Sequence, residues 1–179
     1  MESHIFVEES HTTADSKQRP VKEYYKGLFD MVMSLYDELA ELTDVHLHVL
    51  SEKYGVIGGD EKMTDVCANQ NSIGSDQMAE QATMKLLDAA AEADVMIVLL
   101  STDVFQQTVD NVWDELVTTA RSESIWCLGA AQSCLQGLDF ERLESDGCTV
   151  LTYQRVGVAR LGTETRKELL EAVELKATQ

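Results

Sequence analysis

A run of six apolar residues, Val95–Leu100, constrains the fold of this chain more than any other feature. The run is far shorter than the roughly 20 residues that an apolar helix needs to cross a bilayer. It also lacks the polar alternation of a half-exposed strand, so it is typical of a strand that is buried on both faces of a parallel sheet. We therefore expect a central strand over Asp94–Ser101, with helices covering both faces of its sheet.

Segments typical of strands and of helices alternate along the rest of the chain. The other expected strands are His4–Glu8, Val45–Leu50, Ile125–Gly129 and Cys148–Tyr153. The expected helices are Val21–Leu42 behind Pro20, Ser75–Ala93 capped by Ser75 or Asp76, Val104–Arg121 capped by Ser101 or Thr102, a short piece ending near Glu144, and a last helix capped by Thr163. Met63–Ser75 has no period and predicts a surface loop. The sequence thus predicts a single α/β domain over residues 1–179, three-layered and doubly wound, with about five mostly parallel strands.

The loop after the second expected strand gathers chemically reactive side chains. The candidate ligand contacts are Ser51, Lys53, Tyr54, Gly55, Gly58, Gly59, Asp60 and Glu61. Lysine and tyrosine hold a phosphate or polarise a carbonyl, a carboxylate acts as a base or binds a ribose hydroxyl, and glycines let the backbone approach a ligand. Ligands of open α/β sheets bind at the carboxyl ends of the strands, where this loop begins. An ordinary surface turn has the same composition and is the alternative.

The polar loop after the first expected strand leaves the same edge of the predicted sheet. Glu8, Glu9 and His11 are candidate acids or bases there, and Asp60 is a fourth candidate from the neighbouring loop. For His11, an exposed loop histidine without a function is the alternative. The sequence leaves the catalytic residues unassigned.

Metal and cofactor motifs are not evident in the sequence. His46 and His48 share one face of a strand, because side chains alternate with period two, but no third ligand stands near them. The four cysteines form no CxxC pair and fit small core residues. The turn at Gly129–Ser133 matches neither glycine-rich phosphate-binding pattern. We therefore assign no metal site and no cofactor.

Acidic side chains outnumber basic ones by 32 to 14, for a formal net charge of -18. They are spread over the whole chain, which is typical of a halophilic protein in a high-salt cytoplasm where repulsion is screened. Such a charge disfavours anionic membranes and nucleic acids, so a nucleic-acid partner is compatible only with high salt. Arg155, Arg160 and Arg166 form a small basic cluster that suits either an anion or neighbouring carboxylates. With no signal peptide and no membrane segment evident, we expect a cytoplasmic protein whose oligomeric state is open.

Two motifs in the first third of the chain resemble an uncharacterised prokaryotic family that is distantly similar to the YaaA peroxide-stress proteins. They are Arg19-Pro20-Val21-Lys22-Glu23-Tyr24-Tyr25 with Gly27-Leu28-Phe29, and Leu50-Ser51-Glu52-Lys53-Tyr54-Gly55-Val56-Ile57 with Asp60. The family typically shows P-A-K-x-L-Y and L-S-A-K-Y-G-L-L at these places. This chain departs from the family after the first strand, where Glu8-Glu9-Ser10-His11 replaces a loop with Cys and Lys, and at Met63-Thr64-Asp65, which replaces P-Y-D. The resemblance implies a site around Ser51–Gly55 and supplies no reaction.

Taken together, these features predict a protein that binds a nucleotide, a nucleoside or another phosphate ligand, with a nucleoside-processing enzyme as an open extension. The ligand would lie in a crevice formed by the loops after the first three expected strands. A small molecule is thus the expected partner. The alternative is a non-enzymatic stress or defence protein that acts through a protein or DNA partner, using the Met63–Ser75 or Arg155–Arg166 segment.

Overall fold

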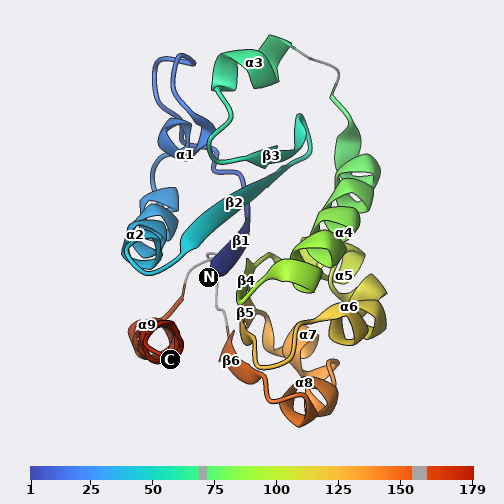
Figure 1. Cartoon of the computed structure of the whole chain (residues 1–179). Coiled ribbons are helices and arrows are strands. Elements are labelled where there is room, and N and C mark those ends of the chain that lie inside the picture. The colour runs from blue at the N-terminus through green and yellow to red at the C-terminus, as the bar shows by residue number, and fades with distance from the viewer. Residues whose placement is uncertain (69–71, 155–160) are drawn as a thin grey trace.

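The computed structural model describes residues 1–68, 72–154 and 161–179, and one six-stranded sheet runs through its middle (Figure 1). The strands are β1 (Glu2–Glu8), β2 (Asp44–Ser51), β3 (Gly55–Gly58), β4 (Val95–Leu99), β5 (Ile125–Ala130) and β6 (Thr149–Gln154). Their order in the sheet is β3-β2-β1-β4-β5-β6, and β3 alone runs antiparallel to its neighbour. The expected three-layer α/β fold is confirmed, with one strand more than predicted.

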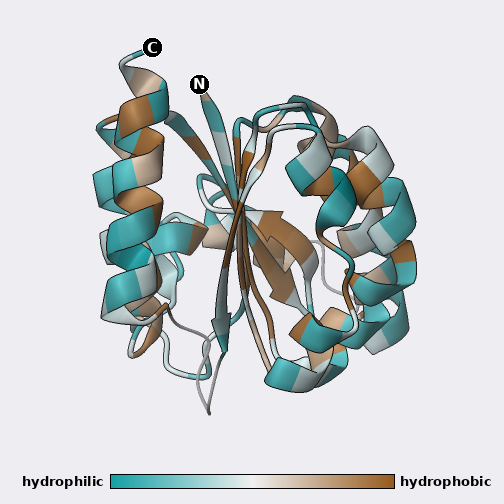
Figure 2. Cartoon of the chain, turned by 90° about the horizontal axis from the view of Figure 1, so that it is seen from below, coloured by the Kyte–Doolittle hydropathy of each residue, from teal (hydrophilic) through white to brown (hydrophobic). Residues whose placement is uncertain are grey.

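Helices cover both faces of the sheet, as the view along the sheet edge shows (Figure 2). One face packs against α1 (Val21–Tyr24), α2 (Phe29–Ala40), α3 (Met63–Ala68) and α9 (Thr163–Ala177). The other packs against α4 (Gly74–Glu92), α5 (Thr102–Gln107), the 3-10 helix η1 (Asp110–Val112), α6 (Trp113–Thr119), α7 (Gln132–Gln136) and α8 (Glu141–Ser145). Among the described residues, no helix combines the length and apolarity that crossing a membrane requires.

The central strand β4 is buried along its whole length, as its apolar sequence predicts. Met96 and Val98 belong to the core under α4, whereas Ile97 and Leu99 belong to the core under α2 and α9. Each face of the sheet therefore has its own apolar core. Both tryptophans, Trp113 and Trp126, are buried on the α4 side.

Four predicted elements are wrong in detail, and glycine explains two of the first three. The segment Val21–Leu42 is not one helix, because Gly27 adopts a φ of 71° and separates α1 from α2. The expected loop after β2 contains β3, a short edge strand whose first residue, Gly55, has a φ of 85°. The expected loop Met63–Ser75 begins with helix α3.

The helix caps also differ from those predicted. The residues at the N-cap positions of α4 and α9 are Ile73 and Gly162, so Ser75, Asp76 and Thr163 do not cap these helices. The expected helix Val104–Arg121 is divided into α5, η1 and α6. Ser101 does occupy the N-cap position of α5, but its side chain makes no capping hydrogen bond. Its hydroxyl bonds elsewhere, at the sheet edge described next.

Candidate functional site

The loops after β1 and β4 diverge at the centre of the sheet. From β1 the chain goes to β2 on one side, and from β4 it goes to β5 on the other. Such a reversal leaves a crevice at the carboxyl ends of the two strands, which is where ligands of this fold class bind. In this structure the reversal lies between Glu8, the last residue of β1, and Ser101, which follows β4.

A pair of hydrogen bonds joins these two strand ends. The Glu8 carboxylate accepts one bond from the Ser101 backbone N–H at 2.6 Å and another from the Ser101 hydroxyl at 2.9 Å. The predicted capping role of the Ser101 hydroxyl is wrong, because this hydroxyl donates to Glu8 and its oxygen accepts no N–H from the first turn of α5. The partly exposed Glu8 side chain is held in one orientation, with lone pairs left for a ligand.

Glu9 connects the same loop to β2. Its backbone N–H donates to the Leu50 carbonyl at 3.0 Å, and its carboxylate accepts from the Tyr25 hydroxyl at 3.2 Å. Burial raises the pKa of Tyr25 well above its ordinary value, and the adjacent Glu9 carboxylate adds to this rise. Tyr25 consequently stays a protonated donor, and Glu9 is oriented by it.

Ser51 and Gly55 shape the turn after β2. The Ser51 side chain is completely buried, and its hydroxyl oxygen accepts the backbone N–H groups of Lys53 at 3.2 Å and Tyr54 at 3.1 Å. Gly55 then enters β3 in the left-handed region. Both residues are accounted for by the fold, as the surface-turn alternative requires.

Lys53 is exposed beside Glu52 in this turn, whereas Tyr54 is half-buried against the core under α2. The Lys53 ammonium lies 5.2 Å from the centre of the Tyr54 ring, and the Cys67 thiol lies 3.5 Å from the Tyr54 hydroxyl. Burial raises the pKa of Tyr54 to about 12, Cys67 adds to the rise, and Lys17 opposes it. Because the Lys17 ammonium lowers the pKa of Tyr54, it is a second positive charge that acts on this phenol.

The remaining four candidates lie away from this edge. Because β3 runs antiparallel, Gly58 pairs with His48 in the middle of β2, and the Gly59 N–H donates to the Leu47 carbonyl. The Asp60 carboxylate pairs with the Lys22 ammonium at 2.8 Å, and Glu61 accepts the Gly58 N–H. Three residues of strand correspond to about 10 Å. Gly58–Glu61 and Ser51–Gly55 therefore do not form one site, and Asp60 does not join Glu8 and Glu9.

The other singled-out residues have simpler surroundings. His11 is exposed in the loop after β1. Arg166 pairs with Glu38 at 3.0 Å, while Arg155 and Arg160 lie outside the described residues. The four cysteines are unpaired thiols, of which Cys67 alone is not fully buried. An open hollow lies between α4 and the α5–η1 segment. Its lining includes Asp76, Glu80, Gln107 and Asn111 and none of the candidate ligand-binding or catalytic residues.

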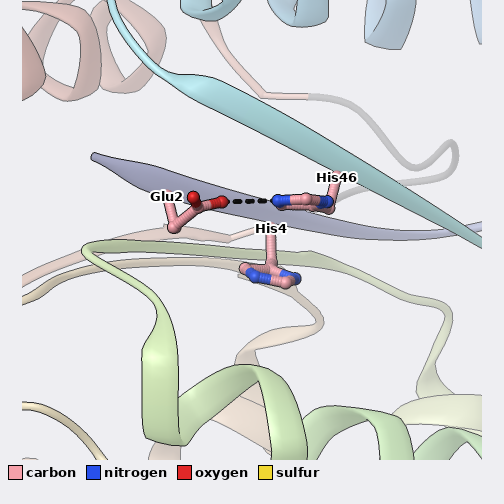
Figure 3. A group of neighbouring side chains, drawn as sticks. All are labelled: Glu2, His4 and His46. Atoms are coloured by element: carbon pink, nitrogen blue, oxygen red, sulfur yellow. Dashed lines mark hydrogen bonds and ion pairs between the residues drawn. The ribbon is translucent and has the colours of Figure 1, made fainter.

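One group of candidate metal-binding side chains was not assembled by the sequence analysis. The register of β1 against β2 sets His4 opposite His46 and brings Glu2 beside them, so the histidine pair does have further neighbours (Figure 3). His4 and Glu2 also alternate with period two, which was the available signal. It was missed because the predicted first strand began only at His4 and the pairing of the two strands was unknown.

No protein-family model, curated protein or solved structure matched this chain. The resemblance to YaaA-like proteins consequently remains a prediction that rests on the quoted motifs alone.

Proposed function

We propose that the chain binds a nucleoside or nucleotide at the carboxyl ends of β1, β2 and β4. The observation that carries the proposal is the Glu8 carboxylate, which Ser101 holds at the point where the strand order reverses. An oriented carboxylate binds paired hydroxyls, such as those of a ribose, because it offers several lone pairs in fixed directions. Glu9, itself oriented by Tyr25, adds a second acceptor.

The charges along this edge suit the two ends of a nucleotide. Glu8 and Glu9 make the end of β1 acidic and would repel a phosphate. Lys53 and Lys17 bring two positive charges to the surroundings of Tyr54, against one negative charge from the exposed Glu52. The hydroxyl-bearing sugar would therefore face β1, and a phosphate would face Lys53. The partly exposed ring of Tyr54 offers a flat apolar surface for the base.

A nucleoside-processing reaction is the catalytic extension of this proposal. In N-glycosidic chemistry a carboxylate such as Glu8 acts as the base or nucleophile at the sugar. The reaction class is tested by incubating the protein with ribonucleosides and deoxyribonucleosides and measuring the release of free base. The structure adds no support to the alternative of a stress or defence protein with a macromolecular partner. The two segments suggested for that partner include residues 69–71 and 155–160, which lie outside the described ranges.

The binding test is isothermal titration with the four ribonucleosides and their 5′-monophosphates, in low salt and in molar KCl. We expect at least one pair to bind, Glu8→Gln to weaken both members at least about 10-fold, and Lys53→Ala to weaken the monophosphate selectively, as loss of one charge-assisted hydrogen bond implies. Glu144→Gln, the same substitution on an exposed residue of α8, is the matched control. Absence of binding throughout the panel, or a Glu8→Gln variant that binds like the wild type, would contradict the proposal.

A further inference from the structure

A cluster of three histidines and two glutamates lies at the opposite end of β1 and β2, near the end of α4. We call Glu2, His4, His46, His48 and Glu92 the histidine cluster. The His4 ring on β1 stacks against two rings on β2: its centre lies 4.7 Å from that of His46 and 5.2 Å from that of His48. Figure 3 shows Glu2 bonded to His46 through its carboxylate, with the His4 ring lying alongside in a nearly parallel plane. Side chains from two strands and one helix thus converge.

Within the cluster, one buried nitrogen of His4 has no hydrogen-bond partner. The residue is only 3% exposed, and its Nδ1 lies 3.0 Å from Nε2 of His48. Its Nε2 lies 3.0 Å from a Glu92 carboxylate oxygen but outside hydrogen-bonding geometry. Buried polar atoms are almost always satisfied, so such an atom requires an explanation, and a bound ion is one explanation.

The geometry around this nitrogen suits a cation. Nε2 of His4 faces the Glu92 carboxylate at 3.0 Å, and the Glu2 carboxylate and the His46 ring lie beside the same imidazole. A cation among these groups would bind a nitrogen lone pair and negatively charged oxygens together.

We propose that Glu2, His4 and His46 bind a divalent transition-metal ion of the Zn²⁺ class, with the fourth position open to water or to Glu92, which lies beside His4. One ligand atom from each of the first three residues lies within 4.8 Å of the others. Zn–N bonds of about 2.0–2.1 Å in a tetrahedron put ligand atoms roughly 3.4 Å apart. The side chains of His46 and Glu2 are 48% and 39% exposed, so both are free to rotate the remaining distance and to admit the ion from solvent.

The surroundings of the cluster favour such an ion. Imidazole nitrogens select Zn²⁺, Cu²⁺ or Ni²⁺ over Mg²⁺ and Ca²⁺, which prefer all-oxygen sites. The contact between Nδ1 of His4 and His48 resembles the outer hydrogen bond that orients most metal-binding histidines. Glu92 stands at the C-terminal end of α4, where the helix dipole is negative. The Asp94 carboxylate accepts the Glu2 N–H, but its charge is offset by an ion pair with Arg121 at 3.3 Å.

The test is titration of the untagged, chelator-treated full chain with Zn²⁺ by calorimetry, and with Co²⁺ by visible absorption. We expect one equivalent to bind, and both His46→Ala and Glu2→Gln to weaken binding at least about 10-fold. His11→Ala, which removes an exposed histidine elsewhere, is the matched control and should bind like the wild type. The Co²⁺ spectrum should show four-coordinate nitrogen and oxygen ligation without thiolate bands, since none of the four cysteines belongs to the cluster.

Four results would overturn the proposal: no binding to the wild type, a His46→Ala variant that binds as tightly as the wild type, thiolate bands with Co²⁺, or equal binding of Ca²⁺. The last would indicate that the acidic surface attracts any divalent cation. Thermal melting of each variant shows whether it is folded. Should His46→Ala unfold, Glu2→Gln decides the question, because it keeps the size of a side chain that is already partly exposed.

Discussion

The two ends of β1 and β2 differ in how their polar groups are satisfied. At the carboxyl end the protein itself pairs most of them: Ser51 bonds the turn that follows it, and Ser101 holds Glu8. At the amino end, Nε2 of His4 is buried beside a carboxylate without a hydrogen bond. The polar groups at the carboxyl end are thus held by bonds within the protein, whereas Nε2 of His4 at the amino end has no hydrogen-bond partner.

The two ends also differ in what their sequences suggested. Ser51 and Gly55 carry the quoted family motif, yet the fold uses both to make a tight turn. The histidines of β1 and β2 carry no motif, yet their strand pairing brings together the side chains of the proposed metal site. A group that the fold leaves unsatisfied is thus a better sign of a missing ligand than a reactive composition is.

The largest effect should come from Gly55→Ala. Gly55 has a φ of 85°, and an added Cβ would meet Ile73 at 3.0 Å and overlap the Gln81 side chain. We expect a loss of about 2–4 kcal/mol in the free energy of unfolding, from backbone strain and overpacking combined. Gly74→Ala is the control: its φ is 81°, nothing lies within 4 Å of its Cβ, and strain alone costs about 1 kcal/mol. Urea denaturation measures both. Equal losses would mean that the turn after β2 is not packed as described.

The next effect concerns pH at the amino end. Burial, with His4, Lys85 and His46 acting in the same direction, lowers the pKa of His48 to about 3. The unfolded chain, with a histidine pKa of about 6.5, binds the extra proton first, so stability falls as the pH drops below about 6.5 and continues to fall toward pH 3. Between pH 7 and 5 this amounts to about 2 kcal/mol.

The same pH prediction is checked by comparing urea denaturation of the wild type and of His48→Phe, with a chelator present. The variant keeps an aromatic ring against Phe6, whose centre lies 4.3 Å from that of His48. It should lose less stability than the wild type between pH 7 and 5, by about 2 kcal/mol. Identical pH dependence in the two proteins would show that the folded protein does not lower the pKa of His48, and hence that His48 is not buried as described.

The smallest effects separate turn-shaping residues from surface residues within the predicted site. Ser51→Ala removes a buried acceptor of two backbone N–H groups and should cost about 1–2 kcal/mol. Asp60→Asn breaks an ion pair with Lys22 in which the Asp60 side chain is 78% exposed, and it should change stability by at most about 0.5 kcal/mol. Chemical denaturation of both variants gives the ranking. A reversed order would refute the structural role assigned to Ser51.

Apolar patterns in the sequence predict the layers of this fold but not its irregular parts. The run at Val95–Leu100 places the central strand, and the alternation at Val45–Leu50 places its neighbour but one. The strand β3 escapes prediction because two of its four residues are glycines and its pairing with β2 depends on the turn that Ser51 stabilises. The break between α1 and α2 likewise depends on the positive φ of Gly27.

The candidate sites are predictable only as far as strand ends are. Glu8 and Glu9 could be placed at a sheet edge from the sequence, but not the bond from Ser101, since the neighbour relation of β1 and β4 is a property of the whole sheet. His4 could be placed beside His46 only once the two strands were paired in register. Which residues face each other across two strands depends on strand order and register, and neither can be read from a single sequence.

Titration of ¹⁵N-labelled protein with Zn²⁺, followed residue by residue by NMR, tests the contrast between the two ends most directly. We predict that the first equivalent shifts the amide signals around Glu2, His4 and His46, with smaller changes at Glu92, while Glu8, Ser51 and Tyr54 stay unchanged. Shifts centred on Glu8 and Glu9, or spread evenly over the acidic surface, would contradict the account.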